Sequence, residues 1–431
     1  MKMRVGIIGG GITGLSAAYE LSKKGCEAEI LEACGEMGGI AGAVRLEGNY
    51  IEKYYHHFFK SDKYVISLLK ELGIEESLKW HESSMGYFAD GRVYKFGTPV
   101  SLMGFKPLPF ADKARFGISV LKLMGKKQWS SLENITAHEW LIKNAGMHVY
   151  NKVWKPLLVT KFGNRFDSIS MAWFWGKVKL RGASKENGKE VLGYINGSCQ
   201  VLLDKLQCSL EAKGAKLRLD CRVDSIDKEN GKLVIHSGND KFSYDKVVST
   251  VPLPVFAELA QGILPENYLS RVKSIEYTSV VCMILTLKQP FSNYYWMNIG
   301  DEGIPFGGLI EHTNLIDKSE YGSKHILYIS NYLYKTSKYY NMNNEELLRE
   351  YIPYLKKINP GFDESWVEKA FAYRDEYAQP IITCGYSKAK PEFETPVEGL
   401  YTASMCNIYP EDRGMNYAIR DGARVAELIS P

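Results

Sequence analysis

The hydrophobic pattern at the start of the chain predicts a strand, a turn, a helix and a second strand. Residues 4–8 form a short run rich in β-branched residues, as in buried strands, and residues 27–31 are predicted to form a second strand. Between them, residues 15–24 have apolar side chains at helical spacing, and the glycine-rich residues 9–14 join the first strand to this helix. The pattern therefore predicts a βαβ unit, in which the two strands run parallel.

The alternation of strands and helices returns after a long helical and aromatic stretch between about residues 60 and 190. A second lobe built on a sheet is predicted between about residues 265 and 380. Strands are predicted at residues 216–219, 222–227, 232–236, 246–250, 280–287, 325–332 and 400–403, and helices at residues 200–213, 345–357 and 417–428. The predicted fold class is α/β, a Rossmann-like domain with an inserted α+β domain.

Composition and charge argue against several function classes. The 431 residues suffice for two or three lobes, each with its own core. With 54 basic and 50 acidic residues the net charge is +4, too balanced to indicate nucleic-acid binding, although it is compatible with an anionic substrate. Eight scattered cysteines show no metal-binding spacing, so we expect no metal site and reduced thiols in the cytoplasm.

No run of about 18 uninterrupted apolar residues is present, so we expect no transmembrane helix. The first 25 residues begin with basic side chains and an apolar stretch, but three successive glycines distinguish them from a signal peptide. Peripheral contact with a membrane stays open, as does the oligomeric state.

The glycine turn fits a dinucleotide-binding motif. Residues 9–14 read GGGITG, a match to GxGxxG, whose glycines allow a tight turn and a close approach of backbone to a pyrophosphate. The N-terminus of the following helix then faces the phosphates. Glu32 follows about 20 residues on, where a carboxylate can accept both ribose hydroxyls. An unrelated glycine-rich turn would not combine all of these features, but the motif alone does not separate NAD from FAD.

Beyond Glu32 the chain resembles one flavoprotein superfamily. Residues 35–42 read GEMGGIAG, and the pair Gly38-Gly39 is similar to that of FAD-dependent amine oxidases, protoporphyrinogen oxidases and phytoene desaturases. In that superfamily the pair runs along the FAD. Ile40 stands where an arginine is common. The resemblance implies FAD as the cofactor and a Rossmann-like FAD-binding domain of the GR2 type.

Three further segments match the same superfamily in the expected order. Residues 222–226 resemble the strand whose valine, here Val223, meets the adenine. Residues 247–252 resemble a strand that ends in a crossover at a proline, and residues 398–403 resemble the C-terminal FAD strand. The implied FAD-binding domain comprises residues 1–60, 190–262 and 390–431, and the implied substrate-binding domain comprises residues 61–189 and 263–389.

The segment after the last of these strands departs from the superfamily. Ser404 and Met405 stand where glycine and an acidic residue are usual, and Glu411 or Asp412 are the candidates to replace that carboxylate. The final helix opens after Arg413, and its free amides are expected to face the flavin. The cofactor-binding residues that we expect are Gly9, Gly11, Ile12, Thr13, Gly14, Glu32, Ala33, Gly38, Gly39, Val223, Met415 and Asn416.

A pair of histidines is the first candidate for contact with the substrate. Residues 49–62 read NYIEKYYHHFFKSD and partly resemble the segment that crosses the flavin in UDP-galactopyranose mutases. That resemblance implies that His56 and His57 provide hydrogen bonds or a proton, with Phe58 and Phe59 as walls of the site. Two histidines that cap an aromatic core fit the sequence equally well.

Cations among aromatic residues are typical of sites that bind an anion joined to a ring. Lys155, Lys161 and Arg181 lie in such a stretch, although surface positions are the favoured interpretation for the two lysines. Arg374, Tyr377 and Tyr386 are further candidates for contact with the substrate, supported only by their position in the chain. The catalytic residues that we expect are His56, His57, Arg181 and Arg413.

Three functions are compatible with these features. The favoured one is an FAD-dependent oxidoreductase in which a substrate donates a hydride to the flavin. The second is a non-redox flavoenzyme resembling the sugar-nucleotide mutases, in which case the substrate is a nucleotide sugar. The third is a flavin-free binding protein of the same fold. The intact glycine motif and Glu32 argue against the third.

Overall fold

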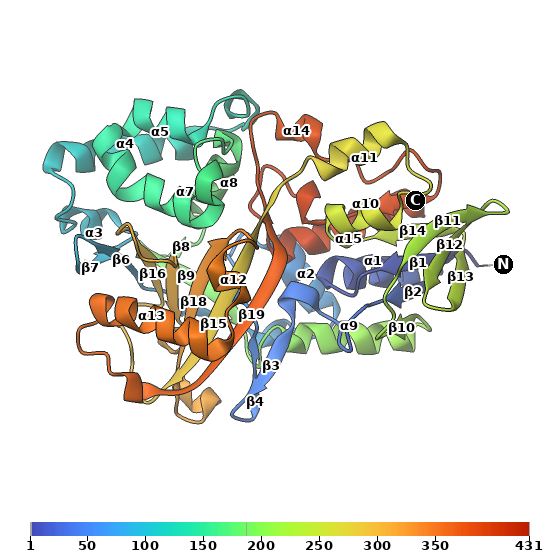
Figure 1. Cartoon of the computed structure of the whole chain (residues 1–431), viewed down its shortest axis with the longest axis horizontal. Helices are drawn as coiled ribbons and strands as arrows, with labels where there is room; N and C mark the ends of the chain where they lie inside the picture. The colour runs from blue at the N-terminus through green and yellow to red at the C-terminus, as the bar shows by residue number, and fades with distance from the viewer. Residues whose placement is uncertain (1, 187, 431) are drawn as a thin grey trace.

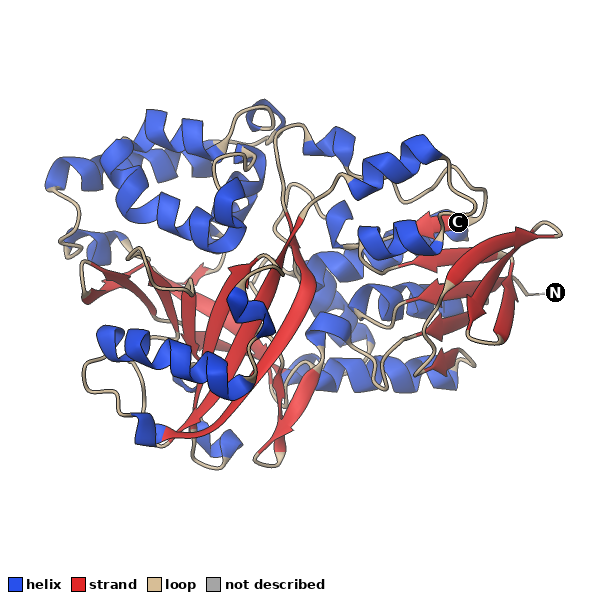
Figure 2. Cartoon of the chain, in the orientation of Figure 1, coloured by secondary structure: helices blue, strands red, loops and turns tan. Residues whose placement is uncertain are grey.

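A computed structural model describes residues 2–186 and 188–430, and two large sheets organise it (Figures 1 and 2). The first sheet has five parallel strands in the order β10-β2-β1-β14-β20. These strands are β1 (Arg4–Ile8), β2 (Glu27–Leu31), β10 (Lys216–Arg218), β14 (Lys246–Ser249) and β20 (Leu400–Thr402). The predicted βαβ unit is confirmed, and the sheet joins the start of the chain to its end.

Helices cover one face of the parallel sheet, and a small antiparallel sheet covers the other. The helices are α1 (Ile12–Lys23), α9 (Gln200–Ala212) and α15 (Met415–Ile429), and the opposite sheet consists of β11 (Ser225–Glu229), β12 (Lys232–Ser237) and β13 (Asp240–Tyr244). Val5 and Ile7 are fully buried in the core shared with the helices. On the other face, a Cβ on Gly6 would lie only 2.6 Å from the Tyr244 ring. Burial of both faces explains why β1 has no polar residue between Val5 and Ile8.

The second sheet is mixed and has the strand order β19-β15-β18-β17-β16-β6-β7. Its strands are β6 (Met85–Ala89), β7 (Arg92–Phe96), β15 (Tyr277–Leu287), β16 (Trp296–Ile299), β17 (Gly308–Glu311), β18 (His325–Leu333) and β19 (Val367–Pro380). Neighbouring strands are antiparallel, except that β16 and β6 run parallel. Helix α13 (Asn344–Ile358) packs against this sheet through Leu347, Tyr351 and Leu355.

A group of helices lies beside the second sheet, at the upper left of Figure 1. These helices are α3 (Pro99–Met103), α4 (Phe110–Gly125), α5 (Ala137–Ala145), α6 (Met147–Val149), α7 (Lys155–Phe162) and α8 (Met171–Gly182). Aromatic side chains hold the group together, as where the rings of Trp154 and Phe174 meet edge to face with centroids 5.3 Å apart. These helices lie in the stretch between about residues 60 and 190 that the sequence predicted to be helical and aromatic.

The remaining elements connect these parts. They are β3 (Ala43–Leu46), β4 (Asn49–Glu52), β5 (Leu78–Glu82), β8 (Lys185–Glu186), β9 (Lys189–Ile195), α2 (Lys63–Glu71), α10 (Leu253–Leu259), α11 (Glu266–Lys273), α12 (Lys338–Asn341) and α14 (Tyr386–Ala389). Strand β9 pairs with β5, so the predicted domain boundary near residue 190 runs through a strand of this small sheet. The domain boundaries stay a prediction.

The prediction of helices between residues 60 and 190 was wrong for β5, β6 and β7. These strands have only five residues each, and the partners of β5 and β6, which are β9 and β16, come from distant parts of the chain, whereas β7 pairs with β6. Strand β19 was also missed, because it is an edge strand and its charged residues hide the period of two. Among the described residues, no helix combines the length and the apolar character needed to cross a bilayer.

Candidate functional site

The glycine turn between β1 and α1 leaves an open helix end. A Cβ on Gly14 would lie 2.1 Å from the carbonyl oxygen of Gly9, so only glycine fits there. By contrast, a Cβ on Gly11 would meet nothing within 4 Å. Gly11 is also the N-cap of α1, and no side chain caps this helix. The amides of Ile12 and Thr13 therefore open the helix beside free space, which is the geometry expected for a bound phosphate.

Glu32 follows β2 directly and contacts this turn. One carboxylate oxygen accepts a hydrogen bond from the Gly10 amide at 2.6 Å, and the other accepts one from the Cys34 amide at 2.9 Å. Ala33, between them, is exposed. Glu32 therefore holds the glycine turn in place. Its contact with a ribose stays a prediction.

The pair Gly38-Gly39 lies against the same turn. The Gly38 amide donates to the Gly10 carbonyl oxygen at 2.8 Å, and Gly38 has a φ of +125°, a conformation that favours glycine. A Cβ on Gly39 would lie 3.4 Å from the Cα of Gly11. Two motifs that the sequence assigned separately to one cofactor are thus in contact.

The C-terminal helix α15 packs directly on α1. A Cβ on Gly422 would lie 2.6 Å from the Thr13 carbonyl oxygen, so the two backbones approach closely. The N-cap of α15 is Gly414, which also lacks a side-chain cap and has nothing within 4 Å of a Cβ position. Two packed helices therefore both begin with an uncapped glycine at an open space. With Glu32 beside the first, this arrangement fits a pyrophosphate cofactor with a second polar end.

Met415 and Asn416 begin α15 and are both buried. The Asn416 side-chain oxygen accepts hydrogen bonds from the backbone amides of Tyr64 and Val65 at 2.8 and 3.3 Å. Asn416 therefore holds the start of α2, and its predicted contact with the cofactor stays a prediction, as does that of Met415.

Val223 does not lie in a strand, which corrects the prediction for residues 222–227. Strand β11 begins only at Ser225, although the Asp224 amide still donates to the His236 carbonyl oxygen at 2.8 Å and its carboxylate accepts a hydrogen bond from the Gly238 amide at 2.7 Å. The Val223 side chain is buried in the core. Its predicted contact with an adenine is untested.

His56 and His57 follow β4, and the His57 ring meets those of Tyr295 and Trp296 edge to face. His56 Nδ1 is 2.6 Å from the Tyr54 carbonyl oxygen, and His57 Nδ1 is 3.1 Å from the Tyr295 hydroxyl. Burial lowers the pKa of His56 to about 4. The hydrogen bond with the Tyr54 carbonyl raises this pKa, and the positive charge of Arg413 lowers it further. Burial lowers the pKa of His57 to about 3, with further lowering by Arg181. Both rings are therefore neutral at neutral pH.

Asp412 pairs with two lysines, of which Lys161 is largely buried and Lys177 is 39% exposed. Its carboxylate lies 2.9 Å from Lys161 Nζ and 2.8 Å from Lys177 Nζ, and it accepts a hydrogen bond from Trp173 Nε1 at 3.2 Å. Burial alone would raise the pKa of Asp412, but the lysines and Arg413 lower it well below its usual range. The surface interpretation of Lys161 is wrong, because only 14% of its side chain is exposed.

Arg413 extends this cluster toward the second sheet. It donates to the Gln379 side-chain oxygen at 3.0 Å and to the Tyr332 hydroxyl, and its guanidinium lies 5.7 Å from the centre of the Tyr332 ring. Lys161, Lys177 and Arg413 therefore lie around one carboxylate. Burial lowers the pKa of Lys161 well below its usual value, but Lys177 and Arg413 alone already exceed the charge of Asp412, and this excess suits an anionic group.

Arg181, at the end of α8, lies 5.5 Å from the centre of the Trp296 ring and 3.8 Å from the Glu190 carboxylate. It affects the pKa of His57, as Arg413 affects that of His56. The four predicted catalytic residues come from three distant segments: His57 and Arg181 both lie against the Trp296 ring, and Arg413 is near enough to His56 to lower its pKa.

The other candidates of the sequence lie apart from this cluster. Lys155 is 37% exposed and 3.8 Å from Glu302, as expected of a surface lysine. Arg374 donates to the carbonyl oxygens of Tyr340, at 2.7 Å, and Met342. The Tyr386 hydroxyl donates to the Cys406 carbonyl oxygen at 3.1 Å. These contacts are structural. Tyr377 packs edge to face on the Tyr277 ring.

The sequence missed Lys177, Trp173 and Tyr332. Lys177 precedes Arg181 by four residues, so the two share a face of α8, and this spacing could have identified it. Nothing in the sequence indicates Tyr332, because β18 brings it to the cluster from a distant segment.

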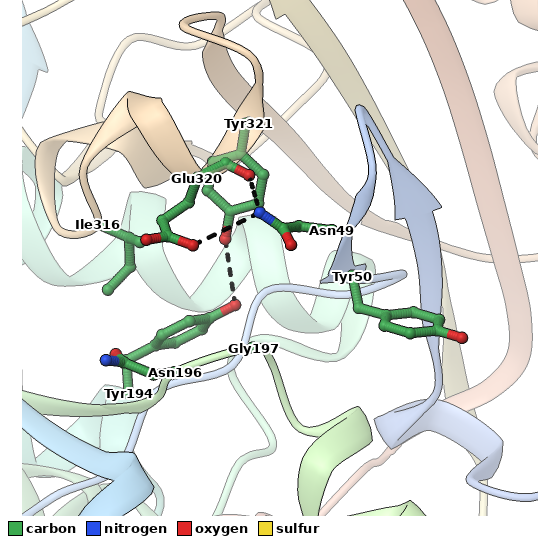
Figure 3. Close-up of a pocket in the computed structure, with 8 residues that line it drawn as sticks. All are labelled: Asn49, Tyr50, Tyr194, Asn196, Gly197, Ile316, Glu320 and Tyr321. Atoms are coloured by element: carbon green, nitrogen blue, oxygen red, sulfur yellow. Dashed lines mark hydrogen bonds between the residues drawn. The ribbon is translucent and has the colours of Figure 1, made fainter.

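A buried carboxylate anchors the strand that leads to the histidines. Glu52 accepts hydrogen bonds from the Cys199 amide at 2.8 Å and from the Tyr194 hydroxyl at 2.9 Å, and burial raises its pKa. Figure 3 shows Tyr194 directed toward Tyr321 beside a cavity of about 20 Å³. Such a cavity holds about one water molecule, so it is too small for a substrate.

Comparison with known proteins identifies the family. Residues 12–430 match the family described as flavin containing amine oxidoreductase. The chain belongs to this family. Among curated relatives, 15-cis-phytoene desaturase of Solanum lycopersicum is 25% identical over 293 residues, which cover 62% of this chain and 48% of the relative. The chain thus spans about half the length of this relative.

Two solved structures have the same fold. A putative protoporphyrinogen oxidase from Exiguobacterium sp. 255-15 superposes with a TM-score of 0.80 at 18% identity, over 100% of this chain and 99% of that one. Reduced UDP-galactopyranose mutase superposes with a TM-score of 0.78 at 16% identity, over 99% and 95% of the two chains. The resemblance, the fold class and the FAD cofactor predicted from the sequence are therefore confirmed.

In this amine oxidoreductase family member, the residues at the two open helix ends fit FAD. Gly11 and Gly414 leave space beside uncapped amides, and Glu32 lies next to the first of these ends. The role of each predicted cofactor-binding and catalytic residue stays a prediction.

Proposed function

We propose that this chain is an FAD-dependent oxidoreductase that takes a hydride from a small organic substrate. The main observation is that the cluster of His56, His57, Arg181 and Arg413 lies in a chain whose two uncapped helix ends fit one FAD. FAD, when bound, supplies the hydride acceptor. The phytoene desaturase and the putative protoporphyrinogen oxidase are likewise named for oxidations.

In this proposal, the chain itself binds and orients the substrate. Neutral His56 and His57 exchange hydrogen bonds with it, since their lowered pKa values keep them uncharged. Arg413 and Arg181 hold an anionic group, and the rings of Tyr332 and Trp296 pack beside it. Asp412 positions the two lysines, since both of its oxygens accept hydrogen bonds from them or from Trp173. The substrate domain is proposed to comprise residues 61–189 and 263–389.

A sugar-nucleotide mutase is the second candidate. The observation that favours it is the excess of positive charge around Asp412, which suits the diphosphate of a nucleotide sugar. The fold of the UDP-galactopyranose mutase is compatible with this reading. In that case the reaction would have no net consumption of electrons.

Reduction and reoxidation of the purified protein separate these functions. The protein is expected to be yellow, to bleach with a substrate under anaerobic conditions and to regain colour with oxygen or a quinone. Steady electron transfer supports the oxidoreductase. Turnover of a nucleotide sugar only after prior reduction, without electron consumption, would instead establish the mutase. A colourless protein that takes up no added FAD would contradict both.

A cytoplasmic location and peripheral membrane contact are also proposed. All eight cysteines are free thiols in the structure, in keeping with a reducing compartment.

A further inference from the structure

Helix α4 has an apolar face that points away from the protein. Phe110, Ile118 and Leu121 are 72%, 52% and 72% exposed, and with Ala114 they follow one another at intervals of four, four and three residues. This spacing places them on one side of the helix. The opposite side is buried, as shown by Ser119 and Leu123. In the described residues, α4 therefore has a second apolar side without a partner.

The short helix α3 continues this apolar face. Val100 and Met103 are 83% and 55% exposed. Lys113 of α4 donates to the Met103 carbonyl oxygen at 2.6 Å, which holds the two helices together (Figure 1). Large apolar side chains that are this exposed are few in the described residues, and five of nine lie between residues 100 and 121. Such clustering marks an interaction surface. We call these two helices the α3–α4 surface.

Positive charge is concentrated in the segment that contains this surface. Residues 91–132 contain eight lysines and arginines but a single acidic residue, Asp112, so the rest of the chain is net negative. Asp112 is buried and lies 3.3 Å from Arg115 and 2.7 Å from His148. Lys106 and Lys122 are exposed beside the apolar side chains. An apolar centre with a basic margin complements an anionic lipid surface, in which acyl chains lie beneath phosphates.

We propose that the α3–α4 surface binds peripherally to an anionic lipid bilayer. Phe110, Ile118 and Leu121 enter the boundary between headgroups and acyl chains, and the lysines contact lipid phosphates. A second copy of the chain is a poorer occupant, because a symmetric contact would bring two strongly basic segments together.

This surface is one helix away from the candidate site. Trp175 of α8 donates to the Leu123 carbonyl oxygen of α4 at 3.1 Å, and Lys179 donates to that of Met124 at 2.6 Å. Helix α8 also contains Lys177 and Arg181. A bilayer bound to α4 would thus lie beside the helix that supplies part of the substrate cluster.

The test is co-sedimentation of the FAD-loaded protein with lipid vesicles. Vesicles of phosphatidylcholine with about 30% phosphatidylglycerol are compared with pure phosphatidylcholine vesicles. The variants are Ile118→Asp with Leu121→Asp, and Lys106→Glu with Lys122→Glu. Leu428→Asp is the matched control, because Leu428 is 46% exposed but lies on α15. We expect the native protein to bind anionic vesicles at least ten-fold more tightly than neutral ones. Both double variants should lose at least ten-fold in binding, and the control should not.

Flavin content and the melting temperature show whether each variant folds. If the variant Ile118→Asp with Leu121→Asp fails to fold, the variant Lys106→Glu with Lys122→Glu decides the test, since both lysine side chains are exposed. Absence of binding to anionic vesicles, equal binding to both kinds of vesicle, or an equal loss in Leu428→Asp would overturn the proposal. Light scattering of the protein without lipid then measures its oligomeric state. A dimer that the double variants dissociate would assign the surface to self-association and would also overturn it.

Discussion

Glu32 joins the cofactor turn to the second strand, because its carboxylate accepts hydrogen bonds from the Gly10 and Cys34 amides. Glu32→Ala should weaken FAD binding by about 1 to 3 kcal/mol through lost hydrogen bonds to a charged group. Titration of the apoprotein with FAD measures this change. Glu36→Ala is the control, since Glu36 is exposed and pairs with Lys53. Equal affinity in Glu32→Ala and the native protein would refute the assignment.

The two histidines should make the protein less stable in acid. His57 is neutral in the folded protein because burial, then Arg181, lowers its pKa to about 3, whereas an unfolded histidine titrates near about 6.5. Between these values the unfolded chain binds more protons, so stability falls as the pH is lowered from about 6.5 toward 3. His57→Asn should lose less stability than the native protein over this range. Urea unfolding at several pH values tests this, and parallel pH profiles would contradict it.

Asp412 should be essential for the stability of the basic cluster. Asp412→Asn leaves Lys161, Lys177 and Arg413 without their buried counter-charge, which should cost about 3 to 5 kcal/mol. Asp90→Asn is the control, because Asp90 pairs with Lys152 at the surface, where such a pair contributes about 1 kcal/mol or less. Denaturant unfolding compares the two. A loss in Asp412→Asn no larger than the control's would show that the lysines do not depend on it.

At the level of elements, the close contact of α1 and α15 holds the two uncapped helix ends in one body. A methyl group at Gly422 would meet the Thr13 carbonyl oxygen at 2.6 Å and Ser16 Cβ at 2.9 Å. Gly422→Ala should therefore separate the helices, destabilise the protein by about 1 to 3 kcal/mol and reduce flavin content.

Gly117→Ala is the matched control for that substitution. Gly117 also lies within a helix, but nothing is within 4 Å of its Cβ position, so alanine should stabilise α4 by about 0.5 to 1 kcal/mol. Thermal unfolding and the absorbance of bound flavin test both variants. Equal effects at the two glycines would mean that the helix contact does not matter.

At the level of the whole molecule, FAD should connect segments from the start and the end of the chain. Removal of the cofactor should therefore lower the melting temperature, and added FAD at 100 times its dissociation constant should restore about 2.7 kcal/mol. Calorimetry at increasing FAD concentration measures the shift. A melting temperature that is independent of FAD would indicate that it does not bind the native state selectively.

The amino-acid sequence determined the parts of the protein that depend on neighbours in the chain. The glycine turn, β1, α1 and β2 follow from apolar spacing and from the special φ values of glycine, so both strands were predicted where they occur, and α1 begins three residues before its predicted start. The sequence also indicated the family and FAD, because these glycine motifs depend on backbone geometry that few other residues allow.

Only the tertiary structure decided which distant side chains meet. Lys161 has the composition of a surface lysine, and its burial against Asp412 follows from the packing of α7 beside the loop before α15. Tyr332 and Gln379 reach Arg413 because β18 and β19 both pair with β15. Local patterns contain no information on such pairings, since hydrogen bonds between strands do not depend on their separation in the chain. The outward face of α4 was likewise decided by packing, which buried one apolar side of the helix and left the other exposed.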